Sequence, residues 1–352
     1  MSDEIWILGA TGRVGRAVAA RLHDAGFRLV LAGRDRARLE TIAGELGGEP
    51  RIVVGAIDIA LSSLTRAAPA VVVNTIGPFA DTAPEVIRAC PAGTHYVDVA
   101  NELDAVSGVL DLNEQAVATN RTLVTGAGFG VLATESVVLQ LCEGQLPAAR
   151  VRVDALASVE TEPGVIGSAL AGSIINGLPA GGRRVEGDRL APARVGGDLE
   201  HLTTPDGITM STALLPSGEL IAAWRASGAP SVIAASSMAP TAPAVRAVLP
   251  VISALARVPM LRRFATGRLA RVPLKARERP RESPGPTPAC NGPQAEIRQG
   301  WLRAGDGMDF TADVTADIAR RLARNEGRSG AYTPGALFGP PLATYAGGQF
   351  IL

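Results

Sequence analysis

The sequence predicts a doubly wound α/β fold in its first part, followed by an α+β domain with a mixed, largely antiparallel sheet. Apolar runs typical of buried parallel strands alternate with helical patterns through the first part of the chain. The 352 residues are 47% hydrophobic and 19% charged, which is enough for about two domains. Because 34 acidic side chains balance 34 basic ones, no net charge favours nucleic acid or an anionic membrane as a partner.

The sequence of the first part predicts alternating strands and helices. Helical spacing of apolar residues follows the first and second strands, over residues 14–26 and 39–46. Asp81 and Pro84 predict the start of another helix after the fourth strand. Buried strands are expected at residues 5–8, 27–32, 51–57, 70–76, 95–99 and 121–125. This order is typical of a doubly wound parallel sheet.

A glycine triplet lies between the first strand and the first helix. Such a turn lets the backbone approach a pyrophosphate, and the N-terminus of the following helix offers N–H groups and a positive dipole to it. A glycine-rich turn without a ligand is the alternative. The residues expected to contact a dinucleotide here are Gly9, Thr11, Gly12, Arg13, Val14 and Gly15.

The end of the second strand indicates which dinucleotide is bound. An NAD enzyme usually has an acidic residue there for the ribose 2′-hydroxyl, whereas this chain has Gly33 and Arg34. The guanidinium of Arg34 suits a 2′-phosphate, and Arg38 or Arg13 would add a second charge. The sequence therefore predicts NADP. The alternatives are that Asp35 is the ribose ligand, or that these arginines form an ordinary solvated helix start.

Two further strand ends carry candidate cofactor contacts. Asp58 follows the third strand, where it would meet the adenine edge or cap a helix. Asn74 ends the fourth strand, and ligands of such sheets bind beyond the carboxyl ends of the strands. Gly77 and Pro78 would allow close approach of a cofactor. Phe79 would wall the nicotinamide side or pack in the core.

Several stretches resemble the saccharopine dehydrogenase superfamily, in the bacterial branch that includes trans-acting enoyl reductases. The most specific are the Gly-Pro-Phe of residues 77–79 and the Gly-Thr-His-Tyr-Val-Asp of residues 93–98. The other stretches are residues 9–15, 32–34, 126–129 and 330–334. Asn101 and residues 130–135 depart from the family pattern near the expected substrate mouth, so the substrate is not carried over.

The resemblance implies an architecture and a reaction class. It implies an NADP-binding Rossmann domain over residues 1–130 and a substrate and dimerisation domain over residues 131–329. Residues 330–352 would return to the Rossmann domain. It also implies reduction of a C=C (enoyl) or C=N (imine) bond, in a protein that is often a homodimer. The substrate would be a small or acyl-type metabolite, with a carrier-protein-bound substrate as one form.

Motifs that the sequence lacks exclude several other kinds of chemistry. Lys275 is the only lysine, so a phosphate-binding loop ending in Gly-Lys-Ser/Thr is absent. None of the three tyrosines is followed by lysine four residues later, which excludes the usual short-chain dehydrogenase apparatus. The three histidines and three cysteines lack metal-ligand spacing, so no metal site is predicted.

The fifth predicted strand carries the best candidates for catalysis. His95 and Asp98 are titratable, and Tyr96 carries a hydroxyl group. Strand alternation places Tyr96 and Asp98 on one face and His95 on the other. Tyr96 or Asp98 is expected to orient the substrate or donate the proton, with Asn101 and Glu102 as second choices. A structural role for each is the alternative.

These observations lead to three hypotheses of function. The first is an NADP-dependent reductase, in which the cofactor supplies the hydride. The second is a catalytically silent dinucleotide-binding sensor or interaction protein, because acid and base groups are few. The third is another enzyme class that uses tightly held NAD. A cytoplasmic location without a signal peptide or transmembrane helix is expected.

The second half is less regular. Strands are expected at residues 151–154, 208–215 and 231–235 and near residues 185 and 199, and helices at 166–176, 244–269 and 314–322. The arginines of residues 246–271 suggest a solvated face, a membrane surface contact or a partner with a phosphopantetheine arm. A loop is expected at 277–293 and a hairpin turn at 305–307.

Overall fold

The computed structural model contains two compact units. Contacts assign Met1–Phe129 and Met308–Ala346 to the first, and Gly130–Gly307 and Gly347–Leu352 to the second. The residues that the structure describes are 4–48, 50–156, 164–165, 181–242, 258–274, 283–284, 287–291 and 297–352. Within these ranges, no helix has the length and apolarity needed to cross a membrane. The roles of the two domains assigned from the sequence stay predictions.

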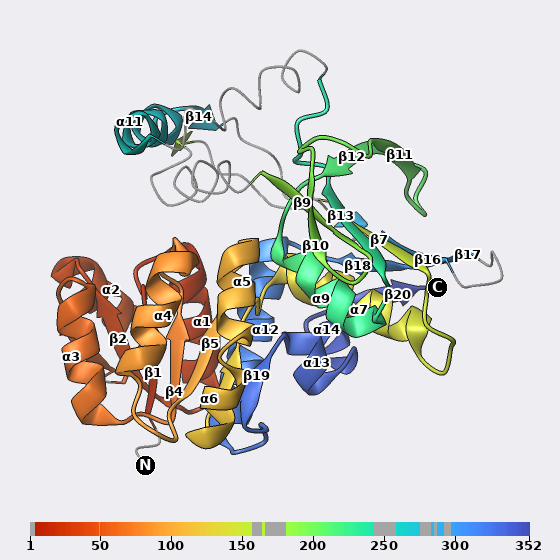
Figure 1. Ribbon diagram of the computed structural model, residues 1–352. Helices are drawn as coiled ribbons and strands as arrows, with labels where there is room; N and C mark the ends of the chain where they lie inside the picture. Colours follow the sequence, from red (N-terminus) through yellow and green to blue (C-terminus); the bar gives the residue numbers. More distant parts are fainter. Residues whose placement is uncertain are drawn as a thin grey trace. The chain divides into compact units, whose positions relative to one another are not determined.

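The first unit is built on a seven-stranded parallel sheet in the order β3-β2-β1-β4-β5-β6-β19. Its strands are β1 (Glu4–Leu8), β2 (Arg28–Gly33), β3 (Arg51–Val54), β4 (Val71–Asn74), β5 (His95–Asp98), β6 (Thr122–Val124) and β19 (Gly330–Tyr332). The order reverses between β1 and β4, as in a doubly wound sheet. The predicted fold class is confirmed (Figure 1).

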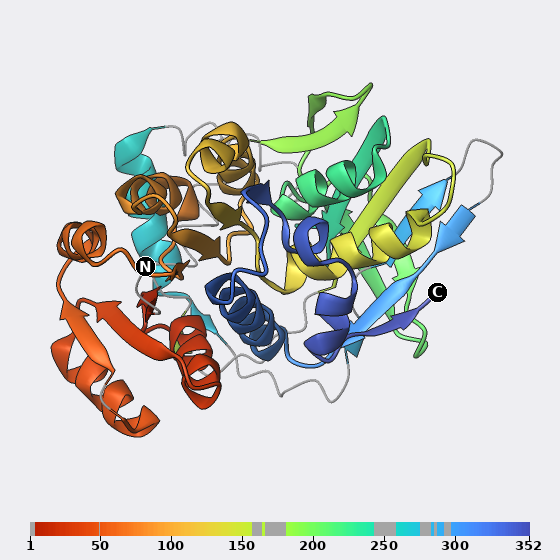
Figure 2. The ribbon, with the colours of Figure 1, turned by 90° about the horizontal axis from the view of Figure 1, so that it is seen from below.

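Helices cover both faces of this sheet (Figure 2). On one face, α1 contacts α2, and Arg21 of α1 forms hydrogen bonds with Asp309 and Asp313 of α12. On the other face, α3, α4 and α5 contact one another in chain order. The helices of this unit are α1 (Arg13–Asp24), α2 (Arg36–Leu46), α3 (Ile57–Ala67), α4 (Phe79–Ala89), α5 (Leu103–Leu110), α6 (Asn113–Ala118), α12 (Gly307–Ala323), α13 (Pro334–Phe338) and α14 (Pro341–Tyr345).

Three predicted boundaries in this unit are wrong. The third strand ends at Val54 rather than at residue 57, because the chain turns into α3. The fourth ends at Asn74, whose side chain holds the following turn. The next helix begins at Phe79, so Pro84 lies inside α4 and not in its first turn. Apolar residues continue past these strand ends, which is why the pattern extended them.

The second unit is built on a mixed sheet in the order β10-β9-β13-β7-β16-β17, with β12 paired to β13 and β11 to β12. Among the strands that the structure describes in this sheet, only β13 and β7 pair in parallel, so the predicted, largely antiparallel sheet is confirmed. The strands are β7 (Arg150–Ala155), β9 (Gly182–Glu186), β10 (Leu190–Ala193), β11 (Glu200–Thr203), β12 (Thr209–Leu214), β13 (Ser231–Ser236), β16 (Thr287–Asn291) and β17 (Ile297–Gln299).

Smaller elements complete the second unit. The helices are α7 (Phe129–Cys142), α9 (Gly218–Ser227), which packs on β13 and β7, and α11 (Pro259–Ala270). The remaining strands are β8 (Gly164–Val165) with β14 (Pro273–Leu274), and β15 (Ser283–Pro284) and β20 (Gln349–Ile351) on either side of β18 (Trp301–Ala304).

Two expectations for the second half are wrong, and others fall outside the described residues. The predicted loop at 277–293 contains β15 and β16, and β16 forms because it pairs with β7. Residues 305–307 lead from β18 into α12 and make no hairpin. The helix expected at 166–176, and residues 244–257 of the next expected helix, are not described.

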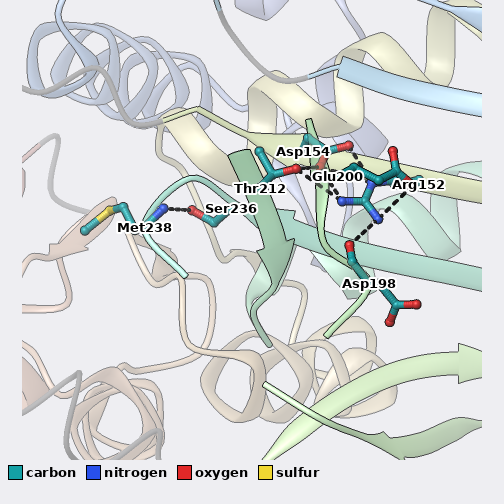
Figure 3. Close-up of polar contacts among 7 residues, drawn as sticks. All are labelled: Arg152, Asp154, Asp198, Glu200, Thr212, Ser236 and Met238. Atoms are coloured by element: carbon teal, nitrogen blue, oxygen red, sulfur yellow. Dashed lines mark hydrogen bonds and ion pairs between the residues drawn. The ribbon is translucent and has the colours of Figure 1, made fainter. Parts of the chain in front are cut away.

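The alternating sequence of strand β7 is typical of a half-buried strand, yet both of its faces are buried. Its polar face carries Arg152, whose Nε and Nη2 donate to the Asp154 carboxylate at 2.9 to 3.1 Å. Its Nη1 donates to the Asp198 carbonyl oxygen at 2.9 Å and pairs with Glu200 at 3.2 Å, and Thr212 donates to Asp154 at 2.6 Å (Figure 3). This network satisfies the guanidinium and the carboxylate within the protein.

Removing one member of this buried pair should be costly. Arg152→Met leaves the Asp154 carboxylate buried without its partner, and we expect a loss of about 3–5 kcal/mol in the free energy of unfolding. The double variant Arg152→Met/Asp154→Leu should recover most of that loss. Urea denaturation of the purified variants measures both effects.

The matched control is Arg36→Met, which breaks the exposed pair of Arg36 with Glu40. It should change the free energy of unfolding by no more than about 1 kcal/mol. If Arg152→Met and Arg36→Met cost the same, the buried pair does not stabilise the second unit.

Candidate functional site

The turn between β1 and α1 depends on two glycines. At Gly9, where φ is +82°, an added Cβ would lie 2.7 Å from Thr75 Oγ1. At Gly15, an added Cβ would lie 2.4 Å from the carbonyl oxygen of Gly9. The N–H groups of Gly9 and Ala10 both donate to the Ala32 carbonyl oxygen, at 3.0 and 3.1 Å. The predicted turn therefore packs α1 directly against the end of β1.

The N-terminus of α1 is presented at the carboxyl end of the sheet. Gly12 is the N-cap residue, is exposed, and donates its N–H to the Gly9 carbonyl oxygen at 2.9 Å. No side chain caps the helix, and its first turn contains no acidic residue. The first N–H groups of a helix have no intrahelical acceptor and favour an anion. Arg13 is exposed and Val14 half-buried in this first turn.

The end of β2 lies beside this turn. A Cβ on Gly33 would lie 3.5 Å from Thr11 Cγ2, so the two segments are in contact. Arg34 and Arg38 are exposed, and neither guanidinium has a hydrogen bond or ion pair with a described residue. Arg36 differs, since it pairs with Glu40 at 3.4 Å. Two cationic side chains are thus available next to the glycine turn.

Asp35 has a defined structural role. It is the N-cap residue of α2, and its Oδ1 accepts a hydrogen bond from the Arg38 N–H at 3.1 Å. Such a cap typically stabilises a helix by about 1 kcal/mol. The carboxylate that was the alternative ribose ligand is therefore already engaged in the helix start.

The other predicted cofactor contacts follow the third and fourth strands and lie in different local environments. Asp58 is exposed in the first turn of α3, where a carboxylate suits the helix dipole, and the N-cap is Ala56. Gly77 and Pro78 are half-buried at the entry to α4. Phe79 is only 9% exposed and packs in the core. This burial supports the alternative that Phe79 packs in the core.

Asn74 organises the segment after β4. Its side chain is fully buried, and its Oδ1 accepts from the Ile76 N–H at 3.0 Å. Its Nδ2 donates to Thr82 Oγ1 and to Tyr96 Oη, both at 3.1 Å. Thr82 in turn donates to the Ile76 carbonyl oxygen at 2.6 Å. The amide therefore fixes the turn that leads into α4 instead of facing a ligand.

Asp98 ties together the segments that follow β5 and β6. Its carboxylate is fully buried, and Oδ1 accepts from the Ala100 N–H, the Gly126 N–H and Thr125 Oγ1 at 2.9 to 3.0 Å. Oδ2 has no hydrogen-bond partner among the described residues. Burial raises the pKa of Asp98 to about 6, although these hydrogen bonds oppose the shift. The pKa of this carboxylate thus lies near 6, at the edge of the sheet beyond which ligands of doubly wound folds generally bind.

The three predicted catalytic residues are not brought together. Tyr96 is fully buried, and burial and then the nearby Asp98 charge raise the pKa of its hydroxyl well above its ordinary value. His95 is the first residue of β5, at the end of the strand opposite Asp98. Its Nδ1 accepts a hydrogen bond from the Thr122 N–H at 2.9 Å, and burial lowers its pKa. Only Tyr96 and Asp98 lie near the carboxyl edge of the sheet.

Sequence reasoning missed the threonines of this edge. Thr75 donates to the Leu8 carbonyl oxygen at 2.8 Å, and Thr82 and Thr125 complete the networks of Asn74 and Asp98. Thr75 directly follows β4, Thr82 lies inside α4 and Thr125 directly follows β6. These positions were the signal in the sequence that could have identified them. The second-choice residues Asn101 and Glu102 follow β5, and Glu102 accepts from the Asn101 N–H at 3.2 Å. No group of metal-ligating side chains occurs within the described ranges.

The charge of Asp98 should be visible in the pH dependence of stability. Its folded pKa of about 6 lies above its ordinary value of 3.8, so the protonated form is favoured by folding. This contribution is complete below about pH 4 and is lost as pH rises through about 6, a change of about 3 kcal/mol. Asp98→Asn does not titrate. Wild type should therefore lose about that much stability relative to the variant between these pH values, as measured by urea denaturation.

Asp24→Asn, at the exposed end of α1, serves as the control. Because this variant keeps Asp98, it should not reproduce the change expected for Asp98→Asn. Parallel pH profiles for wild type and Asp98→Asn would show that the carboxylate does not titrate as the burial implies.

Comparison with known proteins gives short sequence matches and a structural match over nearly the full chain. No family model matches the chain. A stretch of 70 residues is 43% identical to the sulfoacetaldehyde reductase of Chromohalobacter salexigens, covering 20% of this chain and 28% of that protein. A stretch of 59 residues is 44% identical to sulfoacetaldehyde reductase 2 of the same organism, covering 17% and 23%. The chain thus spans less than a third of the length of these curated relatives.

The structural match covers the whole molecule. Saccharopine dehydrogenase (L-Glu forming) from Saccharomyces cerevisiae aligns with 99% of this chain and 100% of its own, with a TM-score of 0.60 and 11% sequence identity. Identity at this level shows a shared fold and not a shared activity. The chain therefore has a saccharopine dehydrogenase-like fold, as the resemblance of its motifs predicted.

Proposed function

We propose that this chain is an NADP-dependent oxidoreductase that transfers hydride from NADPH to a C=C (enoyl) or C=N (imine) bond. The substrate would be a small or acyl-type metabolite, free or bound to a carrier protein. The observation that carries the proposal is the pair of unpaired arginines, Arg34 and Arg38, beside a glycine turn at the carboxyl edge of the sheet. The cytoplasmic location and the homodimer that accompany it are also proposals.

The geometry of this edge supports an assignment of the cofactor contacts. The backbone of Gly9–Gly15 and the N-terminus of α1 would hold the pyrophosphate. Arg34 and Arg38 would bind the 2′-phosphate, since Asp35 already caps α2. Gly77 and Pro78 would border the nicotinamide, which supplies the hydride when the cofactor is bound.

Tyr96 and Asp98 are assigned a positioning role in this proposal. Both are fully buried, so neither reaches a substrate directly in this conformation. They hold the segments after β4, β5 and β6 at the edge where a substrate would meet the cofactor. His95 is left out of the site, because it lies at the opposite end of β5.

Three observations bear on the choice of acceptor. The curated relatives are named for reduction of an aldehyde, but the matched stretches cover at most 20% of this chain. The chain also has no tyrosine with a lysine four residues later. Arg152 and Asp154 satisfy each other, so this buried pair is not offered as a site for an amino-acid substrate. The proposal therefore keeps enoyl and imine acceptors.

A second candidate is a catalytically silent dinucleotide-binding sensor. The full burial of Tyr96 and Asp98 favours it, because a reductase needs a proton source near the acceptor. Such a sensor would use the same cofactor site as the reductase and would differ from it only in not transferring hydride.

Cofactor selectivity should depend on the two arginines. Arg34→Ala and Arg38→Ala each remove a charged donor from the 2′-phosphate, and we expect each to weaken NADPH binding by about 10- to 100-fold. NADH binding should change little. Titrations followed by nicotinamide fluorescence measure both affinities, with Arg36→Ala as the control, because Arg36 pairs with Glu40. A wild-type preference for NADH that is lost in Asp35→Ala would contradict the NADP assignment.

Hydride transfer is tested separately from binding. The purified protein with NADPH should reduce an enoyl thioester or a cyclic imine, as followed by loss of reduced nicotinamide absorbance and by product mass. Arg34→Ala should raise the KM for NADPH. Turnover of an aldehyde alone would move the function to carbonyl reduction, and tight NADPH binding with no turnover would favour the silent sensor.

A further inference from the structure

The outer side of α11 combines large apolar side chains with arginines. Met260 and Phe264 lie one helical turn apart and are 77% and 68% exposed. Leu261 is also exposed, and so are Val258 and Val272 just beyond the two ends of the helix. The helical repeat places Arg263 and Arg268 on either side of the Met260–Phe264 row. We call this group of five residues, Met260, Leu261, Arg263, Phe264 and Arg268, the α11 face.

The opposite side of α11 is partly covered. Ala265, Thr266, Leu269 and Ala270 are half-buried, whereas the residues of the α11 face are exposed. Leu269 is thus the one large apolar side chain of α11 that is partly covered, whereas Met260, Leu261 and Phe264 are exposed. An ordinary surface helix instead buries most of its large apolar side chains. The α11 face needs a partner for that reason.

The charge around the α11 face is one-sided. Residues 258–274 contain no acidic residue, although the whole chain has a formal net charge of zero. No guanidinium of the four arginines in this range has a hydrogen bond or ion pair with a described residue, and these arginines are Arg262, Arg263, Arg268 and Arg271. A partner for this face must therefore be anionic as well as apolar.

We propose that the α11 face docks on an anionic lipid surface. Met260, Leu261 and Phe264 would enter the region below the headgroups, and the flanking arginines would contact lipid phosphates. A lipid surface accommodates separate protruding side chains without matching pockets. An acidic protein would need a preformed pocket for each large side chain. The proposal goes beyond hydride transfer and does not depend on it.

Vesicle flotation of the full chain tests the proposal. Vesicles of phosphatidylcholine mixed with an equal amount of phosphatidylglycerol should bind the protein, and vesicles of phosphatidylcholine alone should not. Added salt should weaken the binding. Met260→Ser/Phe264→Ser should lower the partition coefficient by about tenfold or more, since both side chains lose apolar burial. Arg263→Gln and Arg268→Gln should each lower it by about fivefold.

Matched controls replace exposed residues elsewhere. Leu146→Ser and Arg66→Gln change an exposed apolar and an exposed cationic side chain and should bind as wild type does. As a direct probe, Phe264→Trp should be quenched by brominated lipid, whereas the native Trp6, Trp224 and Trp301, none of which lies on the α11 face, should not. Equal melting temperatures of all variants would exclude unfolding as the cause.

Three results would overturn the proposal. The first is no binding to the mixed vesicles, and the second is binding that the α11 variants leave unchanged. The third is α11-dependent binding of an acidic acyl carrier protein without any vesicle binding, which would assign the face to a protein partner. NADPH titration of the same preparations distinguishes these outcomes from failure of the proposed function.

Discussion

The close approach of α1 to the end of β1 is the constraint on which the proposed site depends. It exists because an added Cβ at Gly15 would lie 2.4 Å from the Gly9 carbonyl oxygen, and one at Gly9 would lie 2.7 Å from Thr75. A side chain at Gly15 would push the helix away from the sheet, and one at Gly9 would meet the segment that follows β4. The helix dipole and its first N–H groups would then no longer meet a phosphate held at this edge.

The remaining strand ends are held by buried polar side chains. Asn74 fixes the turn after β4, and Asp98 joins the segments after β5 and β6 through three hydrogen bonds to one oxygen. Each such bond contributes about 1 kcal/mol to stability, but leaving its buried partner unpaired costs more. The edge is thus rigid before any ligand arrives. This rigidity is what a hydride-transfer site requires, because hydride donor and acceptor must be aligned closely.

Local patterns in the sequence predicted most of the first unit. A strand, three glycines and a helix in succession were enough to predict the turn at Gly9–Gly15, and the position of Arg34 followed from the end of β2. Contacts between distant segments were not predictable in this way. Two of the three donors to Asp98 are Thr125 and Gly126, beyond the next helices. Likewise, β16 is a strand only because it pairs with β7. From the sequence alone, the polar face of β7 is expected to be exposed. It is buried because Thr212 and Glu200, from distant segments, pack against it.

The most direct test of the cofactor site is hydrogen exchange of the full chain with and without NADPH, read by mass spectrometry. Backbone amides of residues 10–15 and 33–38 should exchange more slowly when NADPH is bound, because phosphates would occupy the helix N-terminus and the end of β2. NADH should protect the first segment and not the second. Protection confined to the second unit, or at the opposite edge of the sheet, would contradict the site.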